Sequence, residues 1–191
     1  MKEKIILASK SPRRKQLLSD LYDSFDIVVS DADESLPQGI ALKDAVRILA
    51  ERKGELVARE EPDAVVISSD TLVALGDEPL GKPRDREDAY RMLRALCGRW
   101  HSVHTGIAVS YRGRVFSDTA TSLVHFRELS DEEIYGYIDT GEPFDKAGGY
   151  GIQGEAGKFV LEYTGDFDTI VGLSRSLTRR LVDEALTETK D

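Results

Sequence analysis

The sequence has little of what usually assigns a chain to a class at once. Cys97 is the only cysteine among 191 residues, so no disulfide can form within the chain and a reducing compartment is expected. No run of about 18 apolar residues is present, and the apolar stretch after Lys4 is too short for a signal peptide. These absences predict a cytoplasmic protein without a membrane partner.

The sequence also lacks an excess of positive charge, since its formal net charge is −9. Nucleic acids and anionic membranes would repel such a chain, so neither is an expected partner. A Walker A motif, a GxSxG elbow and a GxGxxG fingerprint are absent, and His101, His104 and His125 lack the spacing of a zinc site. P-loop, serine-nucleophile and zinc mechanisms are therefore unsupported.

What the sequence does contain is the alternating pattern of an α/β protein. Its composition is 40% hydrophobic and 32% charged, and no repeat or Pro/Gly-rich linker divides it, so we predict one continuous domain over residues 1–191. Strands are predicted near 5–7, 25–29, 64–68, 72–75, 101–111, 115–126, 158–163 and 169–171, with an interruption at Ser69-Asp70-Thr71. Helices are predicted at 12–21 and 42–59, between Asp85 and Gly98, between Ser130 and Gly141, and at 175–186.

The first predicted helix begins with two arginines, where positive charge is unfavourable. Ser11 is a good N-cap and Pro12 a good first residue, so Arg13 and Arg14 fall in the first turn. The macrodipole makes that end positive, and each added cation costs about 0.3–1 kcal/mol. A bound phosphate chain would remove the conflict, because amides, serine hydroxyls and guanidinium groups all bind phosphate. The alternative is two solvated arginines without a ligand.

Asp70 is the strongest candidate for a functional carboxylate. It follows an apolar run at 64–68, and an acid at the end of a buried strand needs a metal, a cation or a ligand to satisfy it. The structural alternative is an aspartate bonded to loop amides. Lys53 lies on the apolar stripe of the 42–59 helix, where a lysine either snorkels to an edge or points into a site.

Three other segments give weaker signals. Lys82 lies in a Gly-Lys-Pro turn, which is common in proteins. Asp145–Gly154 has four glycines in seven residues, which let a backbone approach a ligand, although a flexible surface loop has the same composition. Gln153 offers a donor and an acceptor for a base edge. Glu34, in an acidic loop, is a candidate ligand for Mg²⁺ or Mn²⁺, although such loops are usually only solvated.

Taken in order, these segments resemble the Maf family of nucleoside triphosphate pyrophosphatases. The matching motifs span nearly the whole chain, and they are Ser9–Leu18, Ser69-Asp70-Thr71, Gly81-Lys82-Pro83, Ser102–Gly106, Asp145–Gly154 and Val171-Gly172-Leu173. Three serines depart from the family pattern. Ser68 and Ser69 stand where Gly-Ala is common, and Ser174 stands where a proline usually follows Gly-Leu.

The resemblance implies an α/β fold like that of inosine-triphosphate pyrophosphatases: an elongated mixed sheet flanked by helices in two lobes, with a central cleft. It implies hydrolysis of the α–β phosphoanhydride of dTTP, UTP and modified pyrimidine nucleotides to the monophosphate and pyrophosphate, a house-cleaning of nucleotide pools. It also implies a divalent cation (Mg²⁺, Mn²⁺ or Co²⁺) and a homodimer. Two alternatives stay open: a nucleotide-binding regulator of septum formation that needs no turnover, and a phosphatase acting on the terminal phosphate.

Roles are carried over residue by residue. Asp70 matches the family's proton acceptor, and Arg13, Thr71 and Gln153 match positions associated with a preference for dTTP and UTP. Polar positions lining the cleft are matched by Ser9, Arg14, Lys53, Lys82 and Lys146. We expect Glu34 and Asp70 to hold the divalent cation together with phosphate oxygens.

Overall fold

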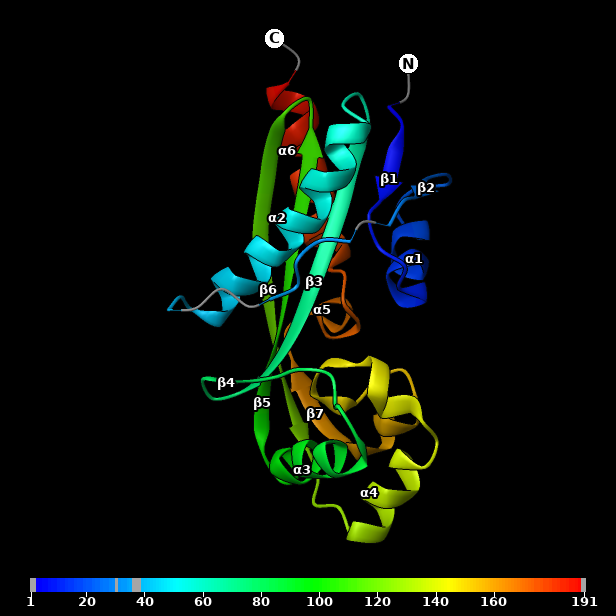
Figure 1. Ribbon diagram of the computed structural model, residues 1–191, viewed down its shortest axis with the longest axis vertical. Coiled ribbons are helices and arrows are strands. Elements are labelled where there is room, and N and C mark those ends of the chain that lie inside the picture. The colour runs from blue at the N-terminus through cyan, green and yellow to red at the C-terminus, as the bar shows by residue number, and fades with distance from the viewer. Residues whose placement is uncertain (1–2, 30, 36–38, 190–191) are drawn as a thin grey trace. The chain divides into compact units, whose positions relative to one another are not determined.

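Helices and strands are interspersed along the chain, as Figure 1 shows for the computed structural model, which describes residues 3–29, 31–35 and 39–189. The elements are β1 (Ile5–Leu7), α1 (Pro12–Ser19), β2 (Asp26–Ile27), α2 (Leu42–Glu60), β3 (Val65–Leu75), β4 (Glu78–Leu80), α3 (Arg86–Leu96), β5 (Trp100–Tyr111), β6 (Arg114–Phe126), α4 (Asp131–Ile138), β7 (Val160–Thr164), α5 (Phe167–Val171) and α6 (Arg175–Glu188). Short 3₁₀ turns at Glu142–Asp145, Ala147–Gly149 and Glu155–Phe159 connect α4 to β7. The predicted mixed α/β architecture is confirmed.

The strands form a seven-stranded mixed sheet in the order β2-β1-β3-β5-β6-β7, with β4 paired to β3. Strand β1 is parallel to both neighbours, and Ile6 lies opposite Asp26 of β2 and Val66 of β3. Strands β4 and β7 are antiparallel to β3 and β6 respectively. Strand β1 and the first residues of β3 are largely buried, which explains why both segments read as continuous apolar runs.

The described chain divides into two compact units. Unit 1 comprises Met1–Asp70, Thr105–Ala120 and Gly172–Asp191, and unit 2 comprises Thr71–His104 and Thr121–Val171. Strand β3 passes from one unit to the other between Asp70 and Thr71. In unit 1, Figure 1 shows α2 in front of the strands and α6 behind them. A single domain over residues 1–191 stays a prediction.

Each unit has its own core. In unit 1, Val57 of α2 packs with Ile6 of β1 and Val66 of β3, and these three side chains are at most 2% exposed. In unit 2, Phe126 of β6 and Tyr137 of α4 both contact the ring of Phe159, with centroid distances of 6.1 and 5.3 Å. The first core fixes α2 against the strands that carry the candidate site.

The helix starts predicted from capping residues are confirmed. The backbone N–H of Arg14 donates to the hydroxyl of Ser11 at 3.4 Å, and Asp85 caps α3 by accepting from the N–H of Asp88 at 2.8 Å. Ser130 and Glu133 form the predicted capping box of α4. Ser174, where the family commonly has proline, caps α6 by accepting from the N–H of Leu177 at 3.4 Å. This departure therefore supplies a helix cap.

The long hairpin of β5 and β6 is also confirmed, with Arg112 and Gly113 at its turn. Both have positive φ angles, 49° and 75°, as a two-residue hairpin turn of the favoured twist requires.

Residues 169–171 form part of helix α5, so the strand predicted there is wrong. Their β-branched side chains favour a strand, but the carboxylate of Asp166 accepts from the N–H of Asp168 at 3.1 Å and starts a helical turn. Two other strands are shorter than predicted. Residues 155–159 form a 3₁₀ turn before β7, and β2 covers only residues 26–27.

Candidate functional site

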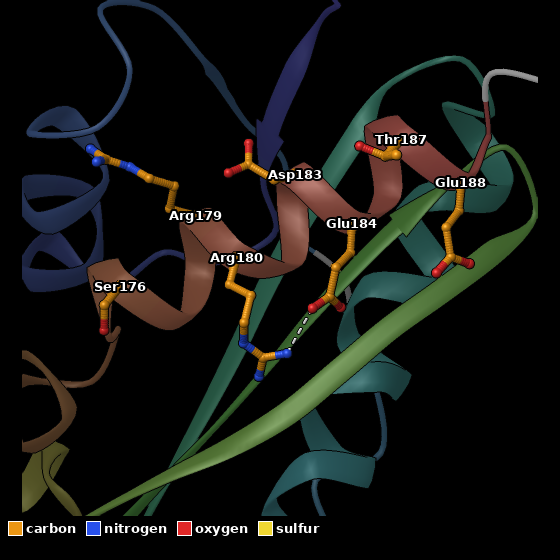
Figure 2. A pocket seen from close by; sticks show the side chains of 7 residues that line it. All are labelled: Ser176, Arg179, Arg180, Asp183, Glu184, Thr187 and Glu188. Carbon is orange, nitrogen blue, oxygen red and sulfur yellow. Dashed lines mark hydrogen bonds and ion pairs between the residues drawn. The ribbon is translucent and has the colours of Figure 1, made fainter.

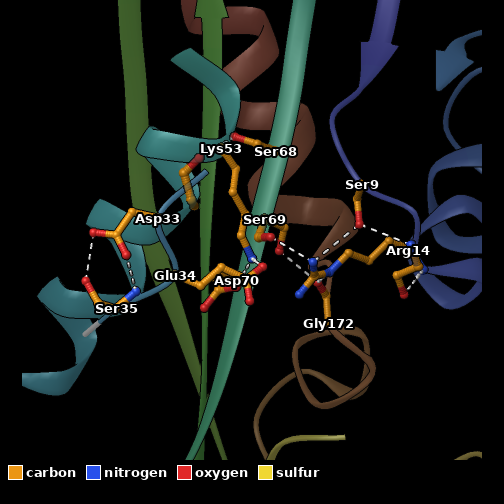
Figure 3. Close-up of polar contacts among 12 residues, drawn as sticks. Ser9, Arg14, Asp33, Glu34, Ser35, Lys53, Ser68, Ser69, Asp70 and Gly172 are labelled. Carbon is orange, nitrogen blue, oxygen red and sulfur yellow. Dashed lines mark hydrogen bonds and ion pairs between the residues drawn. The ribbon is translucent and has the colours of Figure 1, made fainter. Parts of the chain in front are cut away.

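Three consecutive residues of β3, Ser68, Ser69 and Asp70, organise the candidate site (Figure 3). Because side chains alternate along a strand, Ser68 and Asp70 share one face and Ser69 lies on the other. The Ser68 hydroxyl donates to the carbonyl of Ala50 on α2 at 2.7 Å, and the Ser69 hydroxyl donates to the carbonyl of Gly172 at 2.8 Å. Both hydroxyl groups thus find partners on neighbouring segments. Strand β3 runs without a break over Val65–Leu75, so the interruption predicted at residues 69–71 is wrong.

Asp70 forms an ion pair with Lys53 of α2. The Nζ atom of Lys53 lies 2.5 Å from Oδ1 of Asp70, and the two side chains are only 14% and 17% exposed. Lys53 therefore points into the site and does not snorkel to an edge. The sequence predicted that a metal, a cation or a ligand would satisfy Asp70, and the structure shows that a cation, the ammonium of Lys53, does so.

Glu34 reaches the same ammonium group from the loop before α2. Its Oε1 atom lies 2.9 Å from Lys53 Nζ, although the side chain is 61% exposed. Neighbouring contacts hold this loop: the N–H and hydroxyl of Ser35 both donate to the carboxylate of Asp33, and Arg52 of α2 donates to the Ser35 carbonyl at 3.1 Å. Local hydrogen bonds thus bring a second carboxylate to Lys53.

The two carboxylates, Glu34 and Asp70, fit the chemistry of a magnesium-type cation. Carboxylate oxygens are hard donors, and such ions are commonly held by one or two carboxylates together with substrate phosphates and water. Among residues 3–29, 31–35 and 39–189, no three His, Cys, Asp or Glu side chains gather as metal ligands.

Arg14 explains how the first helix tolerates an arginine in its first turn. Its guanidinium donates to the carbonyls of Gly172, at 2.9 Å, and Ser69, at 2.7 Å, and to the hydroxyl of Ser9 at 3.4 Å. Burial lowers the pKa of Arg14, and the negative charge of Asp70 acts in the opposite direction. Arg14 is thus not a solvated arginine, because it ties the start of α1 to the residue before Asp70.

Two other predicted residues belong to the same loop and helix start. Ser9 is 8% exposed, and its hydroxyl accepts from the N–H of Ser11 at 3.3 Å. Arg13 is half-buried, and its charge contributes to the lowered pKa of Arg14. Ser9, Arg13, Arg14, Glu34, Lys53 and Asp70 are therefore all contributed by unit 1.

The remaining predicted residues belong to unit 2. Thr71 of β3 is half-buried, and Lys82 and Gln153 are exposed. Lys146 is 11% exposed at its side chain, and its ammonium donates to the carbonyl of Glu142 at 2.7 Å and to the carboxylate of Asp145 at 2.6 Å. Their roles in substrate binding stay predictions.

The glycines of the segment 145–154 serve close packing inside unit 2. A Cβ atom on Gly148 would come within 2.8 Å of Val73, and one on Gly149 within 3.1 Å of Pro83. The N–H of Gly148 also donates to the carbonyl of Gly81 at 3.0 Å. These two glycines therefore allow close packing within unit 2, and the expected approach of this backbone to a ligand stays a prediction.

Glu142 is a residue of unit 2 that the sequence did not single out. Its carboxylate accepts from the hydroxyl of Tyr137 at 3.3 Å and from the N–H of Glu155 at 3.2 Å, while its carbonyl binds Lys146. A Cβ on Gly154 would clash with this carboxylate at 1.8 Å. Its only sequence signal is its place just before the glycine-rich segment.

A hollow of about 530 Å³ lies along α6 and contains none of the predicted residues (Figure 2). Its lining residues are Ser176, Arg179, Arg180, Asp183, Glu184, Thr187 and Glu188. Arg180 pairs with Glu184 at 2.8 Å and with Asp118 at 2.5 Å, and Glu188 pairs with Arg114. Ion pairs of this kind are typical of a solvated helix face and do not indicate a ligand.

None of the described helices has the length and apolar character to cross a membrane.

Comparisons with known proteins identify the family and the fold of this chain. The model of a family described as Maf-like protein matches residues 4–185. A dTTP/UTP pyrophosphatase of Bdellovibrio bacteriovorus is 44% identical, over 96% of this chain and 100% of its own, and one of Bacillus velezensis is 45% identical, over 96% and 97%. The solved structure of the Staphylococcus aureus Ham1 protein has a TM-score of 0.52 at 18% identity, covering 99% of this chain and 100% of that one, which shows a common fold.

Proposed function

We propose that this chain, which belongs to the Maf family, hydrolyses dTTP and UTP to the nucleoside monophosphate and pyrophosphate. The names and coverage of its relatives support this activity. The observation that carries it is the half-buried ion pair of Asp70 and Lys53, with Glu34 at the same ammonium. In this arrangement a carboxylate that can accept a proton from water lies next to a cation that can bind phosphate.

The proposed step is attack of water on the α-phosphorus. The oxygen of water forms a bond to that phosphorus, and the bond from the phosphorus to the oxygen bridging the α- and β-phosphates breaks. Pyrophosphate leaves with the electron pair of the broken bond, and Asp70 accepts a proton from the attacking water. Lys53 and Arg13 then stabilise charge on the phosphates.

Glu34 and Asp70 are the residues that would hold a divalent cation, whose chemistry when bound is to polarise the phosphate and to neutralise the leaving pyrophosphate. Arg14 fixes the carbonyls of Ser69 and Gly172 and so orients the strand segment that carries Asp70. Mg²⁺, Mn²⁺ and Co²⁺ are the candidate ions, and a titration of activity with each after chelation by EDTA ranks them.

The unit 2 residues are proposed to bind the rest of the substrate. Thr71 and Gln153 contact the pyrimidine, Lys82 contacts the phosphates, and Lys146 matches a polar substrate-binding position of the family. Gln153→Ala should lower the ratio of kcat/KM for UTP to kcat/KM for CTP, because the variant loses a partner of the uracil base. An unchanged ratio would remove Gln153 from base recognition.

Product analysis tests the proposed reaction against its two alternatives. Anion-exchange chromatography after incubation with UTP separates UMP and pyrophosphate from UDP and phosphate. Pyrophosphatase action gives the first pair and terminal phosphatase action gives the second. Reaction in ¹⁸O-labelled water should place the label in UMP, because water attacks the α-phosphorus. Tight binding of UTP without products would favour the nucleotide-binding regulator of septum formation.

A homodimer, a cytoplasmic location and the absence of nucleic-acid binding are retained as parts of the proposal. Sedimentation velocity tests the dimer. A gel-shift experiment with duplex DNA at low salt tests the absence of nucleic-acid binding. No shift is expected, because only a protein with a basic surface would bind DNA under those conditions.

A further inference from the structure

Lys53 lies where it contacts both carboxylates that would hold a cation. Its ammonium is 2.5 Å from Asp70 and 2.9 Å from Glu34. The side chain comes from α2, which is fixed against β3 by the hydrogen bond from Ser68 to Ala50. The ammonium is therefore held at the carboxylates by a rigid helix.

A divalent cation and this ammonium compete for the same oxygens. Both bind the negative charge of Glu34 and Asp70, and they repel each other when close together. The guanidinium of Arg14, held by the carbonyls of Ser69 and Gly172, adds a second fixed positive charge on this side of the protein. A cation entering the protein alone would have to displace Lys53 and leave its ammonium without these partners in a half-buried place.

A polyphosphate changes this balance. Phosphate oxygens bind lysine well, so a nucleotide offers the ammonium of Lys53 a replacement for the two carboxylates. The carboxylates then become available to the cation that accompanies the phosphates.

We propose that Lys53 is a built-in counter-ion that occupies the cation position between Glu34 and Asp70, so that a divalent cation binds well only when a polyphosphate draws the ammonium away. This inference rests on the proposed function, because it takes the nucleotide to be the partner that replaces the carboxylates. It assigns to Lys53 the coupling of cation binding to substrate binding, in addition to its contact with phosphate.

The test measures Mn²⁺ binding to the protein without nucleotide, from the electron paramagnetic resonance signal of free Mn²⁺. Lys53→Met should bind Mn²⁺ at least about tenfold more tightly than the wild type, within the range of typical coupling between sites. Lys53→Arg keeps the charge and should bind Mn²⁺ as the wild type does. Lys43→Met is the matched control, since Lys43 is an exposed lysine of the same helix and its loss changes the net charge equally.

A second titration uses the non-hydrolysable analogue α,β-methylene-UTP with EDTA present. Lys53→Met should bind this analogue more weakly than the wild type does, because the phosphates of the analogue lose a cationic partner. Effects of opposite sign on Mn²⁺ and on the nucleotide distinguish competition from a general defect of folding, which would weaken both.

Equal Mn²⁺ affinity of Lys53→Met and the wild type would overturn the inference, as would equal tightening in Lys43→Met. Failure of the proposed function looks different, since it appears as absence of UMP from wild-type reactions with UTP. Neither Mn²⁺ titration requires turnover, so the two failures are separable.

Discussion

Buried serine hydroxyl groups beside α2 contribute to stability in opposite ways. Ser68 and Ser110 are both buried serines next to Gly54 of α2, yet they differ in hydrogen bonding. Ser68 donates to Ala50, whereas the Ser110 hydroxyl has no hydrogen-bond partner within the described part of the chain. A buried hydroxyl without a partner lowers stability, and one with a partner contributes to it.

Alanine substitutions at these two serines should therefore have opposite effects. Ser68→Ala should lower the free energy of unfolding by about 1 kcal/mol, and Ser110→Ala should raise it by up to about 1 kcal/mol. Urea denaturation of the two variants beside the wild type measures both changes. A Ser110→Ala variant as destabilised as Ser68→Ala would show that the Ser110 hydroxyl is satisfied in solution.

His101 makes the stability of the protein depend on pH. It is 2% exposed, its Nε2 lies 2.7 Å from the hydroxyl of Tyr150, and burial lowers its pKa to about 4. In the unfolded chain the pKa of histidine is about 6.5, so between these values only the unfolded state binds the proton. Stability is therefore full above about pH 6.5 and is lost as the pH falls toward 4.

We expect His101 to account for about 2 kcal/mol of lost unfolding free energy between pH 7 and pH 5. His101→Gln removes this titration while an amide can still bond to the Tyr150 hydroxyl. Its denaturation midpoint should fall less than that of the wild type over this pH interval. An equal fall in both proteins would assign the pH dependence to other groups.

The contact between helix α2 and strand β3 sets the position of Lys53 beside Asp70. Gly54 lies at this contact, and a Cβ atom there would come within 2.6 Å of the Ser68 hydroxyl and 3.3 Å of its Cβ. Gly106 of β5 allows a similar approach, because a Cβ on it would lie 2.5 Å from the carbonyl of Val46 in α2. Small residues on both sides thus let the helix lie close to the sheet.

Gly54→Ala should destabilise the protein by about 1–3 kcal/mol through overpacking and should lower the rate of UTP hydrolysis, since it shifts Lys53. The matched control is Gly136→Ala, because Gly136 is an exposed glycine of α4 with nothing within 4 Å of an added Cβ. That change should stabilise the protein by about 0.5–1 kcal/mol. Thermal unfolding and steady-state kinetics give both readouts, and equal behaviour of the two variants would contradict a close contact at Gly54.

Local sequence signals predicted most elements but not the contacts between distant segments. Ser11, Asp85 and Ser130 cap helices through neighbours three residues away, so the sequence alone located these starts. The partners of Arg14, by contrast, are Ser69 and Gly172, which are 55 and 158 residues away along the chain. No pattern within a short window distinguishes such partners from a bound phosphate.

At the scale of the whole molecule, a chain with a net charge of −9 still places the ammonium of Lys53 beside Asp70 and the guanidinium of Arg14 beside Ser69. The sequence predicted Lys53 and Asp70 separately, and their distance follows from the packing of α2 on β3, which spacing does not encode. The three serines that depart from the family pattern, Ser68, Ser69 and Ser174, all make hydrogen bonds. They therefore change the framework of the protein without removing a charged group from the proposed site.

The chemistry of the whole protein is proposed to depend on one carboxylate, so the most direct measurement is UTP hydrolysis by Asp70→Asn. Asp77→Asn is the control, since Asp77 is an exposed residue of the turn after β3. We expect Asp70→Asn to lose at least about 10²-fold in kcat while it still binds α,β-methylene-UTP, and Asp77→Asn to retain wild-type turnover. Release of UMP and pyrophosphate by Asp70→Asn at the wild-type rate would contradict the account.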